Sequence, residues 1–317
     1  GPAGVKEIAN SELETNETLE HLALGESLKP RTRQRPNHVT TEGLQALLNA
    51  LARNESRRLS SLELCHTALR ADAGKPLADF LGSDSVLTAL DVSGNALASE
   101  GISTLLPACT KLTKLDIADT SCRGELIHTK LCELLEKTQN LNSLSVAYNL
   151  LEPRPLRRIA RALSFCPPLL ALNMAGTAME TEGVIALADG LINSQVSSLR
   201  ELDISENSIS ELEAAMHVAK IIAKTNLQTL RLNRNPLGDA GVCELADALG
   251  SEPCPALRSL ELGSCRVGNL GATVLLRSSR ENEVLLALKL SDNFLDDSLD
   301  ITMVEALQHI QHLQLES

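Results

Sequence analysis

Side chains that could perform chemistry are scattered in this 317-residue sequence. Its closest pair of histidines is His309 and His312, and two ligands are too few for a structural metal site. The eight cysteines form no CxxC pair and show no Cys/His spacing typical of zinc. The patterns GxxxxGK, GxSxG and HExxH, which would indicate phosphate binding, a serine nucleophile and a metalloprotease, are missing. We therefore expect no catalytic site, no metal and no cofactor.

Charged side chains, by contrast, recur at a regular interval of roughly 28 residues. An acidic residue occupies the same place in most of the first half of the chain, and Arg231 occupies it further on. Carboxylates with this period would form one acidic surface, which suits a basic patch on another protein. The candidate partner-binding residues at and beside this place are Glu63, Asp91, Asp116, Asp119, Tyr148, Glu201, Asp203, Glu206, Arg231 and Arg234.

Each of these candidates also has a structural interpretation. A polar row on a solvated surface needs no partner, although solubility alone would not require acidic residues first and Arg231 and Arg234 later. Tyr148, the single tyrosine, could anchor a ligand or simply pack on its neighbour. The four arginines that follow it form either a basic stripe or an ordinary solvated helix face: Arg154, Arg157, Arg158 and Arg161.

The elements that must position these residues follow from a repeated phrase, LxxLxLxx(N/T/C)xL. The stretches Leu87–Leu97 and Leu227–Leu237 both match it. Leu at the fourth and sixth positions would face the core from one side of a short strand, because side chains alternate along a strand. The third, fifth, seventh and eighth positions would then face outward, and the acidic residues described above occupy the fifth.

The ninth position of the phrase calls for a small polar side chain that bonds to the backbone where the chain leaves the strand. From Thr67 to Asn207 its occupants alternate between Thr and Asn, which predicts a doubled repeat. After this turn the apolar residues follow helical spacing, as in Gly183–Leu191 and Gly241–Leu249. Each repeat is therefore expected to be one strand and one helix.

This pattern resembles the ribonuclease-inhibitor-like leucine-rich repeats, which ribonuclease inhibitor, Ran GTPase-activating proteins, tropomodulin and the sensor domains of NOD-like receptors share. The resemblance covers residues 19 to 315. It implies an α/β fold: a curved, right-handed solenoid or horseshoe of about ten repeats, with a parallel β-sheet on the concave face and α-helices on the convex face. It also implies a scaffold that binds a protein on its concave, partly acidic surface rather than an enzyme.

Two other functions are open within the same family. A protein of this shape could stimulate a GTPase, as the Ran activators do, although the strongly acidic tail of those proteins is missing here. It could also be a rigid structural or cytoskeletal spacer that makes contacts through its ends. Fold alone does not choose among these functions.

Composition limits the partners and the location. Apolar residues make up 43% of the chain but aromatic residues only 1%, so aliphatic side chains must build the core. The net charge of -12 argues against binding nucleic acid or an anionic membrane. No charged-then-apolar leader opens the chain, and the cysteines show no disulfide pattern, so we expect an intracellular, cytoplasmic protein, with nuclear or cytoskeletal locations open. Its oligomeric state is not indicated.

The repeat also predicts the domain organisation. Residues 1–18 are expected to be a tag remnant and a cap, and residues 19–317 a single repeat domain that is a fragment of a longer protein. The insertion Lys29–His38 interrupts the first repeat with a proline-bracketed basic loop. Such a loop is either functional or a tolerated surface insertion.

Overall fold

The computed structural model describes most of the chain: residues 1–25, 37–83, 85–166, 168–193, 198–251, 255–296, 299 and 310–315. The chain divides into two compact units, Gly1–Leu150 and Leu151–Ser317, and each is described by itself. The expected insertion Lys29–His38 lies outside the described residues except for its last two, and His309 lies outside them as well.

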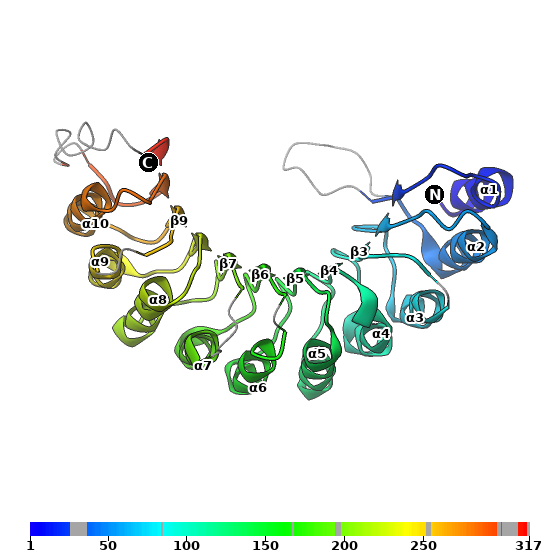
Figure 1. Ribbon diagram of the computed structural model, residues 1–317, viewed down its shortest axis with the longest axis horizontal. Coiled ribbons are helices and arrows are strands. Elements are labelled where there is room, and N and C mark those ends of the chain that lie inside the picture. The colour runs from blue at the N-terminus through cyan, green and yellow to red at the C-terminus, as the bar shows by residue number, and fades with distance from the viewer. Residues whose placement is uncertain are drawn as a thin grey trace. The chain divides into compact units, whose positions relative to one another are not determined.

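The first unit alternates strands and helices. Its strands are parallel and pair in chain order: β1 (His21–Ala23), β2 (Ser61–Glu63), β3 (Ala89–Asp91), β4 (Lys114–Asp116) and β5 (Ser143–Ser145). The helices lie on one side of this sheet (Figure 1): α1 (Pro2–Ile8), α2 (Thr40–Arg53), α3 (Gly74–Gly82), α4 (Ala98–Leu105) and α5 (Glu125–Lys137). We call the other side the strand face, and none of the helices described for this unit lies on it.

Three short helical turns complete the first unit: the π-helix η1 (Ala9–Leu13) and the 3₁₀-helices η2 (Ala71–Ala73) and η3 (Leu106–Lys111). The N-terminal helix α1 lies against α2, where Lys6 pairs with Glu42 at 2.9 Å. Val5 of α1 and Leu13 of η1 are buried. This segment thus covers the apolar side of the first repeat helix.

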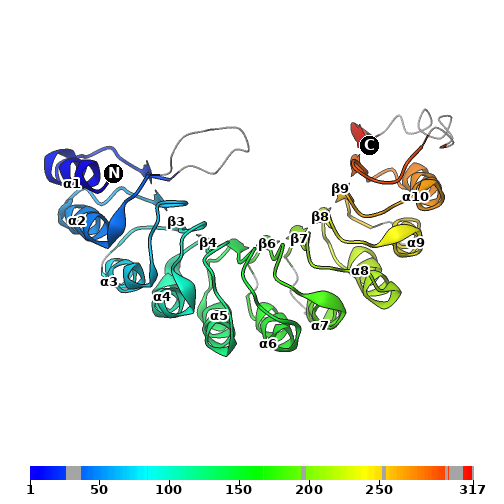
Figure 2. The ribbon, with the colours of Figure 1, turned by 180° about the vertical axis from the view of Figure 1, so that it is seen from behind.

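The second unit follows the same plan. Its strands are parallel and again pair in chain order: β6 (Ala171–Asn173), β7 (Glu201–Asp203), β8 (Thr229–Arg231), β9 (Ser259–Glu261), β10 (Ala287–Lys289) and β11 (His312–Gln314). Its helices also lie on one side of the sheet, as Figure 2 shows from the opposite direction: α6 (Pro153–Leu163), α7 (Glu180–Asn193), α8 (Leu212–Lys224), α9 (Gly238–Leu249) and α10 (Asn269–Glu281). No helix among the described residues is long and apolar enough to cross a membrane.

The core of each unit consists of the leucine positions of the phrase. In every strand from β2 to β10 the middle residue is a Leu, for example Leu90 and Leu230, and each is buried. The sixth position, such as Ile117 or Leu262, is buried as well. Burying one such side chain stabilises the fold by about 2 kcal/mol. The predicted leucine-rich solenoid of alternating strands and helices is confirmed.

Buried asparagines at the ninth position join successive repeats. The Asn95 side chain donates to the carbonyls of Leu64 and Val92 at 2.7 and 2.9 Å, and its Oδ1 accepts the amide N–H of Thr67 at 3.0 Å. Asn149, Asn207 and Asn293 do the same for Thr120, Thr177 and Cys265. Each Asn thus satisfies backbone groups of its own repeat and of the preceding one, which confirms the predicted role of this position and explains the doubled Thr–Asn pattern.

Candidate functional site

The predicted binding residues all lie at the ends of strands or in the turns that follow them. In the first unit, Glu63, Asp91 and Asp116 end β2, β3 and β4, and Asp119 and Tyr148 lie in the next turns. In the second unit, Glu201 begins β7, Asp203 ends it and Arg231 ends β8. Glu206 and Arg234 lie in the turns after these two strands. The two groups differ in how their charges are arranged.

The first unit carries three carboxylates side by side. Glu63 is in register with Asp91, and Asp91 with Asp116, so the three stand on neighbouring strands about 4.8 Å apart. We call Glu63, Asp91 and Asp116 the acidic row. Among the described residues, no Lys or Arg lies within ion-pair distance of the row, and its one partner of opposite type is His21, whose Nε2 is 3.7 Å from Glu63 Oε1.

The aspartates of the acidic row also have a structural task. Asp91 Oδ1 accepts the N–H of Ser93 at 2.8 Å, and Asp116 Oδ1 accepts that of Ala118 at 2.9 Å. In the second unit Asn173 makes the equivalent bond to Ala175 at 3.0 Å. Because the neutral amide of Asn173 accepts the same hydrogen bond, the turn needs only an oxygen acceptor. The fold therefore does not require the negative charge of the row.

Neighbouring acids and burial make the row electrostatically unfavourable. Burial, and to a smaller extent the charge of Asp91, raises the pKa of Asp116, although Lys114 on the same strand partly opposes this. Burial, together with the charges of Asp91 and Glu63, raises the pKa of the adjacent Cys65 thiol to about 11. The row therefore concentrates negative potential that a cationic group would relieve.

Asp119 and Tyr148 extend this surface at the eighth position of their repeats. The Asp119 N–H donates to the carbonyl of Ala147 at 2.8 Å, which places these two turns side by side. Both residues have left-handed backbone, with φ of 49° and 55°. The eighth position is left-handed throughout the described repeats, including Glu206 and Arg234, so the repeat itself imposes this conformation. Tyr148 is 51% exposed.

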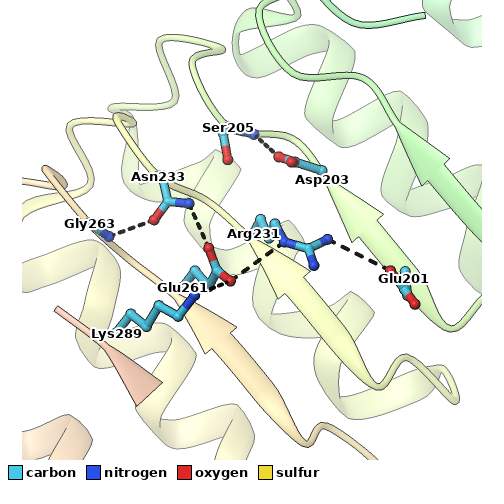
Figure 3. Close-up of polar contacts among 8 residues, drawn as sticks. All are labelled: Glu201, Asp203, Ser205, Arg231, Asn233, Glu261, Gly263 and Lys289. Carbon is cyan, nitrogen blue, oxygen red and sulfur yellow. Dashed lines mark hydrogen bonds and ion pairs between the residues drawn. The ribbon is translucent and has the colours of Figure 1, made fainter. Parts of the chain in front are cut away.

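The second unit has opposite charges in alternation. Arg231 lies between Glu201 and Glu261, at 3.8 Å from Oε2 of the first and 3.5 Å from Oε1 of the second (Figure 3). Lys289 Nζ approaches the same Glu261 oxygen at 2.9 Å. We call Glu201, Arg231, Glu261 and Lys289 the ion-pair ladder. Its members form ion pairs with one another across β7, β8, β9 and β10.

Glu261 is the centre of the ladder, and sequence reasoning did not select it. Its side chain is only 14% exposed, and Asn233 Nδ2 donates to its Oε2 at 3.0 Å. Burial opposes its ionisation, but hydrogen bonds from Lys289 and Asn233 and the charges of Lys289 and Arg231 hold its pKa below the ordinary value. The sequence signal was the alternation of Arg231, Glu261 and Lys289 at the fifth position, because opposite charges on neighbouring strands indicate ion pairs.

A further ion pair and a groove lie elsewhere on the second unit. Arg234 in the turn after β8 pairs with Glu206 at 3.2 Å, so these two predicted binding residues neutralise each other. On the helix side, Arg157 and Arg161 line a groove of about 510 Å³ between α6 and α7, together with Asp189. No group of three or more His, Cys, Asp or Glu that could hold a metal ion occurs in the described part of the chain.

Comparison with known proteins agrees with this architecture. The family described as Leucine Rich repeat matches residues 83–106, 165–188, 223–246 and 254–276. The chain is 28% identical to ribonuclease inhibitor of Mus musculus over 281 residues, covering 86% of this chain and 54% of that protein. It is 27% identical to NACHT, LRR and PYD domains-containing protein 12 of Homo sapiens over 285 residues, covering 89% of this chain and 24% of that protein.

The chain thus spans about half of the ribonuclease inhibitor and a quarter of the second relative. Among solved structures, a chain of the yeast Rad7 and Elc1 complex aligns with a TM-score of 0.56 at 15% identity, covering 86% of this chain and 71% of that one. This structural likeness concerns the fold alone.

Proposed function

We propose that this leucine-rich-repeat chain, which is similar to ribonuclease inhibitor and to a NACHT, LRR and PYD domains-containing protein, binds another protein, and that its acidic row accepts a basic patch of that partner. The observation that carries the proposal is the row itself: Glu63, Asp91 and Asp116 stand in register on adjacent strands without a Lys or Arg pairing with them among the described residues. The mouse relative is by name an inhibitor of ribonuclease, which is itself a protein.

The charges of the row support binding rather than folding. The fold needs an oxygen acceptor at the fifth position, and Asn173 provides one without charge. Keeping carboxylates at Asp91 and Asp116 raises the electrostatic energy of the free protein, which a cation from a partner would lower. Asp119 and Tyr148 belong to the same proposed surface, because their turns adjoin it.

The five candidates of the second unit have a smaller part in the proposal. A partner that used Arg231 or Glu201 would have to compete with the ion pairs that these residues already make. The same holds for Arg234 and Glu206. We therefore assign the main electrostatic contact to the first unit, and we assign rim contacts to Glu201, Asp203, Glu206, Arg231 and Arg234.

We also propose an intracellular location. Its support is that the seven cysteines among the described residues are all free, with no disulfide between them. Burial raises the pKa of the Cys109 thiol to about 12, and burial likewise raises that of Cys166 to about 11, so these thiols stay protonated and unreactive.

The proposal is tested by removing charge while keeping the turn hydrogen bonds. The double variant D91N/D116N retains the Oδ1 acceptors for Ser93 and Ala118 but neutralises two of the three carboxylates. Affinity capture from cell extract with quantitative mass spectrometry should show that the proteins recovered by the unmodified chain are lost with this variant. D203N gives a graded comparison, since Asp203 bonds to the Ser205 N–H in the same way at 3.0 Å and, as a rim position, should reduce the recovery of these proteins much less.

Recovery of the same proteins in the same amount by D91N/D116N would overturn the proposal and favour a spacer that binds through its ends. Stimulation of GTP hydrolysis by a captured GTPase would instead favour the activator function. Either result is distinguishable from loss of folding, because circular dichroism reports the helices of both units.

A further inference from the structure

Three large apolar side chains of the first unit lie exposed in the segments that follow β4 and β5. Leu126, Tyr148 and Leu150 are 49%, 51% and 48% exposed, although single apolar side chains of this size are usually covered in the repeats. All three lie on the side where the strands end and the chain turns toward the helices. We call Leu126, Tyr148 and Leu150 the apolar edge.

The backbone holds the apolar edge in place. The Leu150 N–H donates to the carbonyl of Cys122 at 2.9 Å, and Leu150 forms a parallel bridge with Arg123. Leu126 follows in the first turn of α5. Between Tyr148 and Leu150 lies the buried Asn149, whose side chain donates to Ile117 and Val146 at 2.8 and 3.1 Å. These turns are therefore rigid, so little conformational entropy remains to be lost on binding.

The apolar edge is continuous with the acidic row through the same two repeats. Asp116 is in register with Ser145 on β5, three residues before Tyr148. The next turn brings Asp119 beside Ala147, whose neighbour in sequence is Tyr148. Arg123 and Glu125 add one charge of each sign along the edge. The negative charge of the acidic row would favour a cationic group of a partner. The apolar edge has no excess charge and would favour an apolar group.

We infer that the partner presents a basic segment that also carries an apolar side chain, with its Lys or Arg groups on the acidic row and the apolar group on the apolar edge. This inference rests on the proposed function and adds that the partner's basic segment also carries an apolar side chain. Tyr is a residue type that often dominates binding energy when a partner covers it, which suits Tyr148 at the junction of the two surfaces.

The second unit offers a matched comparison. Leu270 and Phe294 are 68% and 70% exposed, and Phe294 bridges to Gly268 in the same way as Leu150 bridges to Arg123. The strands beside this pair, however, carry Glu261 and Lys289, which neutralise each other. This second pair has exposed apolar surface without an acidic row and is the natural control.

Two fluorescein-labelled synthetic peptides test the inference by fluorescence anisotropy at low salt. One contains lysines and leucines, and the other has each leucine replaced by serine. The chain should bind the leucine peptide about tenfold more tightly, as expected for partial burial of one or two apolar side chains. The double variant L126S/L150S should lose this preference while binding the serine peptide as before, which also shows that it is folded.

The other variants separate the two proposals. D91N/D116N should weaken binding of both peptides, and the control L270S/F294S should change neither. If the chain binds both peptides equally, or if L126S/L150S keeps the preference, the apolar edge is not the anchor, although the acidic row still stands where D91N/D116N weakens both. If neither peptide binds, the acidic row and the inference built on it both fail.

Discussion

The acidic row and three members of the ion-pair ladder, Arg231, Glu261 and Lys289, occupy the same position of the repeat, but their electrostatic environments are opposite. In the first unit, Asp91 and Asp116 face each other as like charges, and the pKa of Asp116 is raised mainly by burial. In the second unit, Glu261 is held between Arg231 and Lys289, and its pKa is lowered despite burial. The same repeat thus carries carboxylates without a Lys or Arg partner among the described residues of the first unit, and ion-paired side chains in the second unit.

The largest change in stability that tests this comparison should come from a substitution of Glu261. Changing Glu261 to Gln removes the negative charge between Arg231 and Lys289 and leaves two cations close together on β8 and β10. We expect the free energy of unfolding of the second unit to fall by about 1–2 kcal/mol, since the pair is only partly desolvated. Hydrogen exchange of the amides in β8, β9 and β10 would measure it. An unchanged exchange rate would mean that the ladder adds no stability.

The equivalent change in the first unit should have the opposite sign. Changing Asp116 to Asn keeps the acceptor for the Ala118 N–H and removes the repulsion from Asp91. We expect the first unit to gain up to about 1 kcal/mol of stability. Urea denaturation, with hydrogen exchange to assign the effect to β3, β4 and β5, would show it. A loss of stability would indicate that the charge of Asp116 serves the fold, which contradicts its proposed use in binding.

The smallest effect concerns the order of titration. A free Glu titrates about half a unit above a free Asp, but the raised pKa of Asp116 and the lowered pKa of Glu261 predict a smaller gap or the reverse order. As pH falls, protonation of Asp116 begins at a higher pH than for an ordinary Asp and removes its unfavourable charge from the folded first unit. The stability that ionised Glu261 contributes above its unfolded pKa is lost as pH passes its lower folded pKa.

Carboxyl carbon NMR of the folded chain, with D116N and E261Q to assign the two signals, would measure this order. The proposed binding of a basic partner should weaken as Asp116 is protonated. If Asp116 instead titrates well below Glu261, the acidic row is not strained as described and the contrast between the two units is lost.

Most of the fold could be predicted because the repeat is local. Leu at the fourth and sixth positions and Asn at the ninth, such as Asn95, recur at fixed offsets, and each needs only its own and the adjacent repeat to be satisfied. The site was less predictable. The positions of Asp91, Asp116 and Arg231 on the strand face followed from the phrase, whereas the pairing of Arg231 with Glu201 and Glu261 required knowing which side chains reach across neighbouring strands.

The apolar edge also could not be predicted from the repeated phrase. Leu126 and Leu150 are separated by most of a repeat in sequence, and their shared exposure depends on how the turn at Cys122 and Arg123 meets the turn at Leu150. Tyr148 was selected because it is the single tyrosine, but its backbone conformation is imposed by the eighth position of the repeat.

The amino-acid sequence by itself determined the repeat, the strand and helix of each repeat, the core and the strand-face positions, because periodic burial of aliphatic side chains leaves few alternatives. Only the tertiary structure decided which of the exposed charges remain available. Ion pairing depends on distances of a few ångströms between side chains of different strands, and a pattern of residue types does not contain those distances. The same position of the repeat can therefore hold a carboxylate beside another carboxylate at Asp116 and an ion-paired carboxylate at Glu261.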